Sequence, residues 1–323
     1  MKILYHALLK GINMKNIMAL TIAVASVLTL SACGGGGGGG DNSAPTPQSP
    51  QIRADEGIWN TPSDPSLLPM QAVILDDGSY WGLYGTKYNP DDGTFFSIDL
   101  ILHGAASISG NNASGAYTIF TNGYASSPDY FYGTGTYSGA ALAQNNLSLT
   151  FNDPTFDNML VKNFSMNYDS IYKQPIPLAQ IEGNYLPGGY IFQTCPSSAD
   201  TCSFPRPDNP SLTISGSSLT LYDGNGAVAM TGTIAPHGTT VNVFDVSLAT
   251  SNANPIASVP AGETFGISVP LSGTPPSYIY NVPAGTVFNG ILFQTSAGQP
   301  SNYIEIIAAS KDSIFYFLGN RQD

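Results

Sequence analysis

Charged residues are scarce in this chain, and basic residues are scarcer than acidic ones. Only 10% of the 323 residues are charged, with 10 Lys and Arg against 22 Asp and Glu, so the net charge is −12 at pH 7. Nucleic-acid binding needs clustered Lys and Arg, and the sequence has no basic patch. The composition therefore disfavours nucleic acid as a partner, and an anionic membrane surface would repel the chain.

Residues that commonly carry catalysis or bind metals are few. The chain has three histidines and three cysteines. His103 and His237 lack the sequence context of a triad or a third zinc ligand. The pairs Asp76-Asp77 and Asp91-Asp92 each precede Gly, which is turn chemistry, whereas a glycosidase pair must face each other across a substrate. We therefore predict no catalytic residue, no metal and no cofactor, and hence no enzyme.

The apolar run near the N-terminus is too short for a membrane-spanning helix. It covers 17–32, which is 16 residues, whereas a spanning helix needs about 20. It follows Lys15 and ends in small residues, as secretory signals do, and Met14 fits the true start. Leu30-Ser31-Ala32-Cys33 resembles the lipobox of bacterial lipoproteins. The resemblance implies cleavage before Cys33 and attachment of fatty-acid chains such as palmitate to that cysteine.

The lipoprotein resemblance also implies a location. An Asp after the lipidated cysteine commonly retains such proteins at the inner membrane, but position 34 is Gly. We therefore expect a lipid anchor in the outer membrane, on its periplasmic face or the cell surface. Seven glycines, 34–40, begin a Gly/Pro/Ser-rich stretch that cannot bury enough apolar surface to fold. This stretch, 33–54 with the cysteine, is predicted to be a flexible tether.

The remaining two cysteines, Cys195 and Cys202, are separated by six residues. A secreted protein meets an oxidising compartment, and neither His nor further Cys lies near this pair. The spacing therefore predicts a local disulfide and not a metal site.

The rest of the sequence is typical of an all-β fold. Short aromatic and β-branched segments alternate with Gly, Pro and Asn turns, and no window has a helical apolar period. Glu-Gly-x-aromatic occurs twice, at 56–59 and 182–185, and opens two similar halves. We predict two tandem antiparallel lobes, each barrel-like or sandwich-like. The predicted organisation is signal 1–32, tether 33–54, lobe 55–167, linker 168–180 and lobe 181–323.

Strands and turns are predicted in both halves. Asp-Gly between apolar runs predicts a hairpin at 76–78, Asp223-Gly224-Asn225-Gly226 predicts another turn, and the linker is expected to form one short helical turn before Pro175. The expected strands are 71–75, 79–85, 95–102, 115–120, 130–137, 147–151, 211–214, 219–222, 227–234, 241–248, 265–270, 278–282, 287–294, 303–308 and 314–318.

Several short motifs occur along the mature chain, at residues 56–59, 75–81, 168–172, 178–185, 231–236, 242–246 and 314–319. Together they resemble a family of two-domain lipoproteins of Gram-negative bacteria with poly-Gly tethers. The family has no assigned activity, so the resemblance implies no catalytic residue. A weaker likeness, of architecture alone, is to two-lobed surface lipoproteins that bind host proteins.

Aromatic residues supply the candidate contact surface. On one strand, Tyr80 and Tyr84 share a face and Trp81 lies on the other. One set packs inside, and the outward set is expected to form a contact surface, because tyrosine offers a large area with a polar tip. The candidate contact residues are Tyr80, Trp81 and Tyr84. The alternative is an ordinary tyrosine-rich β surface.

The function predicted from these features is non-enzymatic binding of an unknown protein or small-molecule partner at the cell envelope. The first alternative is a structural or assembly lipoprotein with passive lobes. The second, a hydrolase, needs convergent carboxylates or a nucleophile in a cleft, which the sequence does not indicate. A pocket inside a lobe would favour a small ligand, and filled lobes would favour a protein partner or the passive role.

Overall fold

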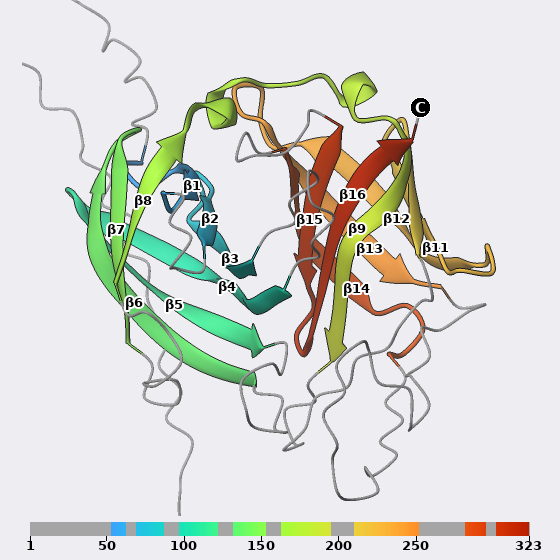
Figure 1. Ribbon diagram of the computed structural model, residues 1–323, viewed down its shortest axis with the longest axis horizontal. Coiled ribbons are helices and arrows are strands. Elements are labelled where there is room, and N and C mark those ends of the chain that lie inside the picture. The colour runs from blue at the N-terminus through green and yellow to red at the C-terminus, as the bar shows by residue number, and fades with distance from the viewer. Residues whose placement is uncertain are drawn as a thin grey trace, which may run out of the picture. The chain divides into compact units, whose positions relative to one another are not determined.

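The computed structural model contains two closed antiparallel β-barrels in tandem (Figure 1). It describes residues 53–62, 69–86, 97–121, 132–152, 163–194, 210–251, 282–294 and 302–322, which all belong to one compact unit, 50–323. Several predictions lie outside the described residues. They are the signal, Cys33, residues 33–52 of the tether, the Cys195 and Cys202 pair, Asp91-Asp92, the strand expected at 265–270, and residues 278–281 of the strand expected at 278–282.

Barrel 1 comprises eight strands, each paired with the next along the chain. The first strand also pairs with the last, which closes the sheet, and Trp59 lies opposite Tyr168 in that closing pair. The strands are β1 (Gly57–Asn60), β2 (Met70–Ile74), β3 (Ser79–Thr86), β4 (Ser97–Ser109), β5 (Asn112–Thr121), β6 (Tyr132–Leu142), β7 (Asn146–Asn152) and β8 (Asn163–Asp169).

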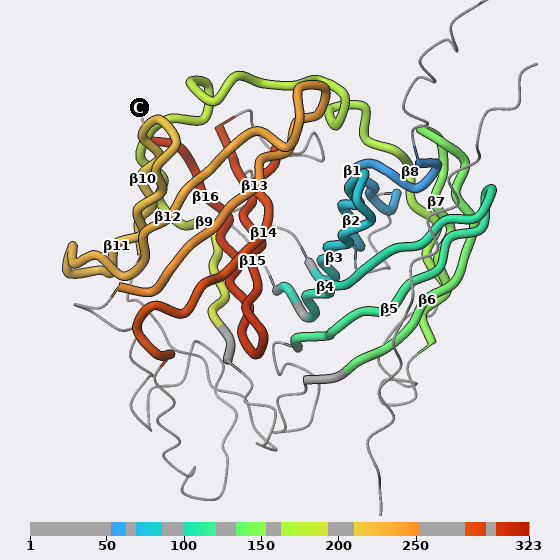
Figure 2. Tube along the Cα trace, turned by 180° about the vertical axis from the view of Figure 1, so that it is seen from behind, coloured from blue at the N-terminus to red at the C-terminus, as the bar shows by residue number. Residues whose placement is uncertain are grey.

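Barrel 2 repeats this meander, and its first strand pairs with both its second and its last strand. Two 3₁₀ turns, η1 (Ser170–Lys173) and η2 (Leu178–Gln180), lie on the connection between the barrels (Figure 2). The strands are β9 (Gly183–Thr194), β10 (Ser211–Ser215), β11 (Ser218–Tyr222), β12 (Val228–Pro236), β13 (Val243–Thr250), β14 (Val287–Phe293), β15 (Tyr303–Ala309) and β16 (Ser313–Gln322).

The first strand of each barrel begins with the same local structure. Trp59 Nε1 donates to the Asp55 carbonyl at 2.8 Å, and the Tyr185 hydroxyl donates to the Ile181 carbonyl at 2.8 Å, in each case four residues back. The intervening Gly57 and Gly183 have φ of +155° and +147°, which side chains disfavour. The repeated Glu-Gly-x-aromatic motif is therefore a structural repeat, in which the aromatic side chain folds back onto the chain that enters the barrel.

Side chains of the barrel itself fill the interior of each barrel. In barrel 1 they form one buried cluster that includes Tyr117, Tyr137 and Phe151, and in barrel 2 a second cluster includes Phe192, Phe288 and Phe315. The alternating burial of β7 reflects this arrangement, with every second residue facing inward. The described residues thus place a packed core in each barrel.

Tyrosine rings in barrel 1 pack directly over glycines of the neighbouring strand. Tyr117 lies opposite Gly135, and Tyr137 lies opposite Gly115. A Cβ built on Gly135 would come within 2.6 Å of Tyr117 Cε2, and one on Gly115 within 2.6 Å of Tyr137 Cζ. Only glycine leaves room for these rings, so the glycines help the barrel accommodate its large aromatic residues.

The structure confirms the predicted turn chemistry. Asp77 Oδ1 accepts hydrogen bonds from the Ser79 amide at 2.7 Å and the Ser79 hydroxyl at 2.6 Å. Asp223 Oδ1 accepts from the amides of Asn225 and Ala227 at 3.0 and 2.8 Å. Both carboxylates therefore stabilise turns between paired strands.

The linker contains the short helical turn that was expected before Pro175, and Asp169 Oδ1 caps it by accepting from the Ile171 amide. Most predicted strands are present, with ends that differ by a few residues. The sequence interpretation omitted β8, which runs to Asp169 through the position where the linker was expected to begin.

A third buried cluster joins the two barrels through their outer faces. Barrel 1 contributes residues that include Val73, Trp81 and Ile101, and barrel 2 contributes residues that include Ile291 and Tyr316. Every residue of β15 is buried, because one of its faces lines barrel 2 and the other packs against this cluster. The two barrels thus share an apolar interface.

Candidate functional site

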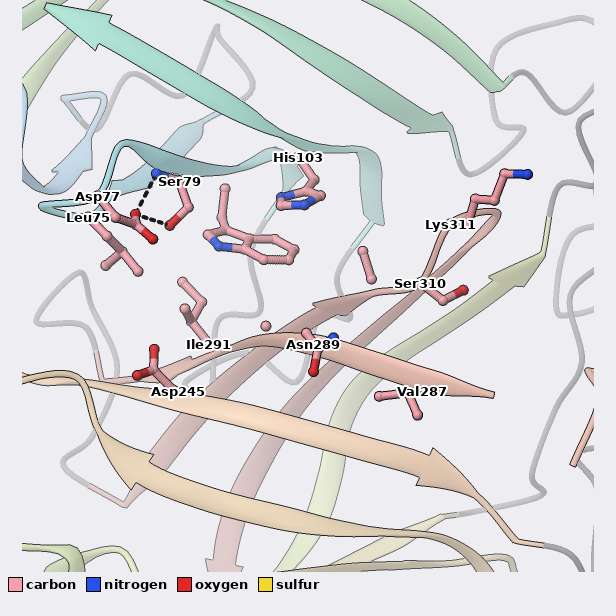
Figure 3. Close-up of a pocket in the computed structure, with 13 residues that line it drawn as sticks. Leu75, Asp77, Ser79, His103, Asp245, Val287, Asn289, Ile291, Ser310 and Lys311 are labelled. Carbon is pink, nitrogen blue, oxygen red and sulfur yellow. Dashed lines mark hydrogen bonds between the residues drawn. The ribbon is translucent and has the colours of Figure 1, made fainter. Parts of the chain in front are cut away.

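A partly open cleft lies beside this apolar interface, with one wall from each barrel and a volume of about 440 Å³ (Figure 3). Barrel 1 supplies Leu75, Asp77, Ser79, Trp81 and His103, and barrel 2 supplies residues that include Asp245, Val287, Asn289 and Lys311. We call this feature the inter-barrel cleft. Figure 3 shows Asp77 and Asp245 toward one end and Lys311 toward the other.

Two stacked rings from adjacent strands form part of the barrel 1 wall. The ring centroids of Trp81 and His103 are 3.8 Å apart and the planes differ by 19°. His103 Nδ1 lies 3.3 Å from the Tyr80 carbonyl oxygen, which can only accept, so this nitrogen carries the proton. Burial lowers the pKa of His103 below its ordinary value of 6.5, so the imidazole is neutral near pH 7.

Next to the acidic end of the cleft, a histidine that does not itself line the cleft is held between two carboxylates. His237 follows β12, and its Nδ1 lies 2.7 Å from Asp245 Oδ1 of the same barrel. Its Nε2 lies 3.1 Å from Asp76 Oδ1 in the turn between β2 and β3 of barrel 1. Burial lowers the pKa of His237, but the hydrogen bonds and charges of Asp245 and Asp76 outweigh it, so the net effect raises the pKa. This side-chain bridge joins the two barrels.

A second polar link between the barrels passes through the linker. The Tyr172 hydroxyl donates to Glu56 Oε1 at 3.1 Å, and Lys173 Nζ lies 2.7 Å from the same oxygen. The Tyr172 carbonyl accepts from the Asn242 amide of barrel 2 at 2.7 Å. Tyr172 therefore contacts the first strand segment of barrel 1 and a loop of barrel 2 at once.

The prediction that Tyr80, Trp81 and Tyr84 form an exposed contact surface is wrong. Tyr80 and Tyr84 point into barrel 1 and are 0% and 5% exposed. Trp81 lies on the opposite face, as the alternation requires, but it is 4% exposed because the outer face of barrel 2 covers it. Only Trp81 of the three lines the cleft, through a small exposed edge.

Few sequence features indicate the residues that line the cleft. His103 and His237 lack the context of a triad or a zinc site, and neither Asp245 nor Asn289 belongs to a catalytic or metal-binding motif. One available signal was the nearly continuous apolar character of 303–309 and 313–319, because strands covered on both faces read this way. That signal locates an interface but not the polar residues beside it.

The described residues do not assemble a metal site. No group of three or more His, Cys, Asp and Glu side chains among them is placed to hold a metal ion. Asp76 and Asp245 contact different nitrogens of His237, on different sides of the ring, so the three groups do not converge on one point. In the same part of the chain, no helix combines the length and apolarity that crossing a bilayer requires.

The fold and the cleft define a protein of two closed eight-stranded antiparallel barrels joined face to face. No family model and no curated protein matches the chain. Two crystal structures are among those with some similarity.

One is a candidate outer membrane protein of Bacteroides fragilis NCTC 9343, at 12% identity and a TM-score of 0.22, with 83% of this chain and 96% of that chain covered. The other is a Trp-176-Ala mutant of the vaccine antigen transferrin binding protein B of Haemophilus parasuis Hp5, at 11% identity and a TM-score of 0.26, with 80% and 68% covered. Scores this low carry no argument about this chain.

Proposed function

We propose that this protein is a non-enzymatic lipoprotein, anchored in the outer membrane through Cys33, that binds a protein partner in the inter-barrel cleft. The observation that carries the proposal is that the barrel interiors are packed, whereas the cleft beside the interface between the barrels is partly open. Each barrel interior holds a packed cluster of its own aromatic and aliphatic side chains. The cleft, in contrast, is concave and lined by polar side chains from both barrels.

The lining of the cleft favours a particular kind of partner. Asp77 and Asp245 are exposed at one end, and the hydrogen bonds from Ser79 help to lower the pKa of Asp77 against a larger opposing effect of burial, so this carboxylate is charged at neutral pH. The whole chain is acidic as well. Complementary charge steers association, so the expected partner inserts a segment that presents Lys or Arg toward Asp77 and Asp245.

A passive spacer is the second candidate, and one observation favours it. The large apolar side chains exposed in the described part of the chain are Leu142, Leu186 and Val287, which are 52%, 49% and 48% exposed and lie on three different strands. Scattered apolar residues do not form the contiguous patch typical of a stable protein interface. The cleft is therefore the feature by which the two candidates differ.

Photo-crosslinking in cells separates these functions. A benzophenone amino acid at Val287 or Asn289 places the reactive ketone in the cleft, and the same amino acid at Leu142, outside the cleft, is the matched control because Leu142 and Val287 have nearly equal exposure. The expected result is a discrete, light-dependent adduct from both cleft positions and none from position 142. Absence of adducts from the cleft, or the same adducts from position 142, would refute cleft binding and leave the spacer role.

A further inference from the structure

We propose that His237 is a pH-dependent latch that fastens the Asp76–Gly78 turn of barrel 1 to barrel 2 at the acidic end of the inter-barrel cleft. The latch regulates the site described above, and its biological role rests on the proposed function. Its operation, however, can be measured in the protein alone.

The latch follows from the protonation of the His237 ring, because the observed contacts require a proton on both ring nitrogens. Both ring nitrogens of His237 face carboxylate oxygens, at 2.7 Å from Asp245 and 3.1 Å from Asp76. A carboxylate only accepts hydrogen bonds when ionised, so both contacts need an N–H and the imidazole must be doubly protonated. In the neutral form one nitrogen would present a lone pair to a negatively charged oxygen.

The inter-barrel contact is the one that deprotonation breaks. Asp245 is the nearer carboxylate and lies on β13, which pairs with β12 immediately before His237. The backbone also fixes this side, because the His237 amide donates to the Val243 carbonyl at 2.8 Å. The remaining proton therefore stays on Nδ1 facing Asp245, and Nε2 loses its hydrogen bond to Asp76.

Other charged groups near the latch act in both directions, because Asp77 favours the charged form of His237 and Arg53 opposes it. From barrel 1, Asp77 adds a second negative charge beside Asp76, and Arg53 reaches this turn, because a Cβ built on Gly78 would lie 2.7 Å from Arg53 Nη1. Arg53 is itself paired with Asp55 at 3.0 Å. From the linker, the Tyr172 phenol lies within electrostatic reach of Asp76.

The charged residues beyond that phenol are Glu56 and Lys173, which are paired with each other at 2.7 Å. The carboxylates that face His237 directly thus favour its charged form, so the latch is closed below the titration midpoint of His237.

Opening is expected to be local. The apolar cluster between the barrels remains buried whatever the charge of His237, so the barrels stay together. The turn, in contrast, is short and exposed at Asp76 and Asp77. Release of Asp76 frees this turn at the end of the cleft, where Asp77 and Ser79 form part of the lining.

Hydrogen exchange of the purified full-length protein in detergent, followed by mass spectrometry across a pH series, tests the latch. After correction for intrinsic exchange, peptides that cover 76–79 should lose protection several-fold as the pH rises above the titration midpoint of His237, which NMR of ¹⁵N-histidine reports. That midpoint should lie above 6.5, because the folded pKa is raised. The Asp223–Gly226 turn is also held by bonds from backbone amides to a carboxylate, has no His237 contact, and should keep constant protection.

Two variants make the outcome decisive. In His237→Gln the 76–79 peptides should be weakly protected at every pH, and in Asp76→Asn the midpoint of His237 should fall toward 6.5. If protection of 76–79 in the wild type does not follow the His237 titration, or if Asp76→Asn leaves the midpoint unchanged, the latch is refuted. Neither result bears on crosslinking from the cleft, so failure of the latch is distinguishable from failure of the proposed function.

Discussion

Replacing Tyr172 with Phe isolates the polar link between the linker and barrel 1. The variant removes one hydroxyl and keeps the ring, which is 0% exposed and packs in the cluster between the barrels. It also keeps the hydrogen bond from the Asn242 amide, because that bond ends on the backbone carbonyl. The change therefore tests the bond from the phenol to Glu56 and little else.

The size of the effect follows from the burial of the carboxylate. Burial and the charge of Glu56 raise the pKa of Tyr172 well above its ordinary value, so the phenol keeps its proton and donates it to Glu56. Glu56 is 6% exposed and retains only Lys173 as a described side-chain partner in the variant. A hydrogen bond to a charged group contributes about 1.5–3 kcal/mol, and we expect a loss of about 2 kcal/mol.

Thermal and denaturant unfolding of the purified protein measure this loss. For a unit that spans 50–323, about 2 kcal/mol corresponds to a fall in Tm of roughly 3–4 °C. Tyr222→Phe, at a partly exposed tyrosine of barrel 2, is the matched control and should change stability by less than about 0.5 kcal/mol. If Tyr172→Phe unfolds at the same midpoint as the wild type and the control, Glu56 does not depend on the phenol and the reasoning fails.

Two further predictions concern packing and anchoring. Gly135→Ala should destabilise barrel 1 by about 1–3 kcal/mol, because the new methyl group meets the Tyr117 ring. This loss of stability should be smaller in a Tyr117→Leu background. A double-mutant cycle of unfolding free energies measures the difference. An equal cost in both backgrounds would contradict the packing argument. In cells given an alkyne-labelled fatty acid, the wild-type protein should become labelled and the Cys33→Ser variant should not. Label on both proteins would contradict lipidation at Cys33.

The β-hairpins could be predicted from the sequence because their causes are local. Asp77 and Gly78 form a turn through bonds within four residues of the chain, and so does Asp223. The same holds for η1, which Asp169 caps from the preceding position. β8 was missed because its inward residues, Phe164 and Met166, are the only strongly apolar positions in the segment, which is too short a pattern to identify alone.

The packing of the barrels could not be predicted because it depends on pairs of residues distant in the sequence. Alternation correctly placed Tyr80 and Tyr84 on one face and Trp81 on the other. Alternation could not indicate that a second barrel covers the outer face of barrel 1. The sequence pattern of an aromatic residue on an outer face is the same whether water or another barrel lies against it. Only the long apolar runs of β15 and β16 hinted that a second surface needed burial.

The candidate site was hidden for the same reason, and this explains why its residues look ordinary in the sequence. Asp76 and Asp77 were interpreted as turn residues, and Asp77 does form the turn. Asp76 takes on a second role only because barrel 2 brings His237 to within 3.1 Å of it, from 161 positions away along the chain. A turn whose sequence directs its local hydrogen bonds can hold one carboxylate toward its own backbone and offer the next to a neighbour. The turn thus makes the inter-barrel cleft sensitive to the proton on one histidine.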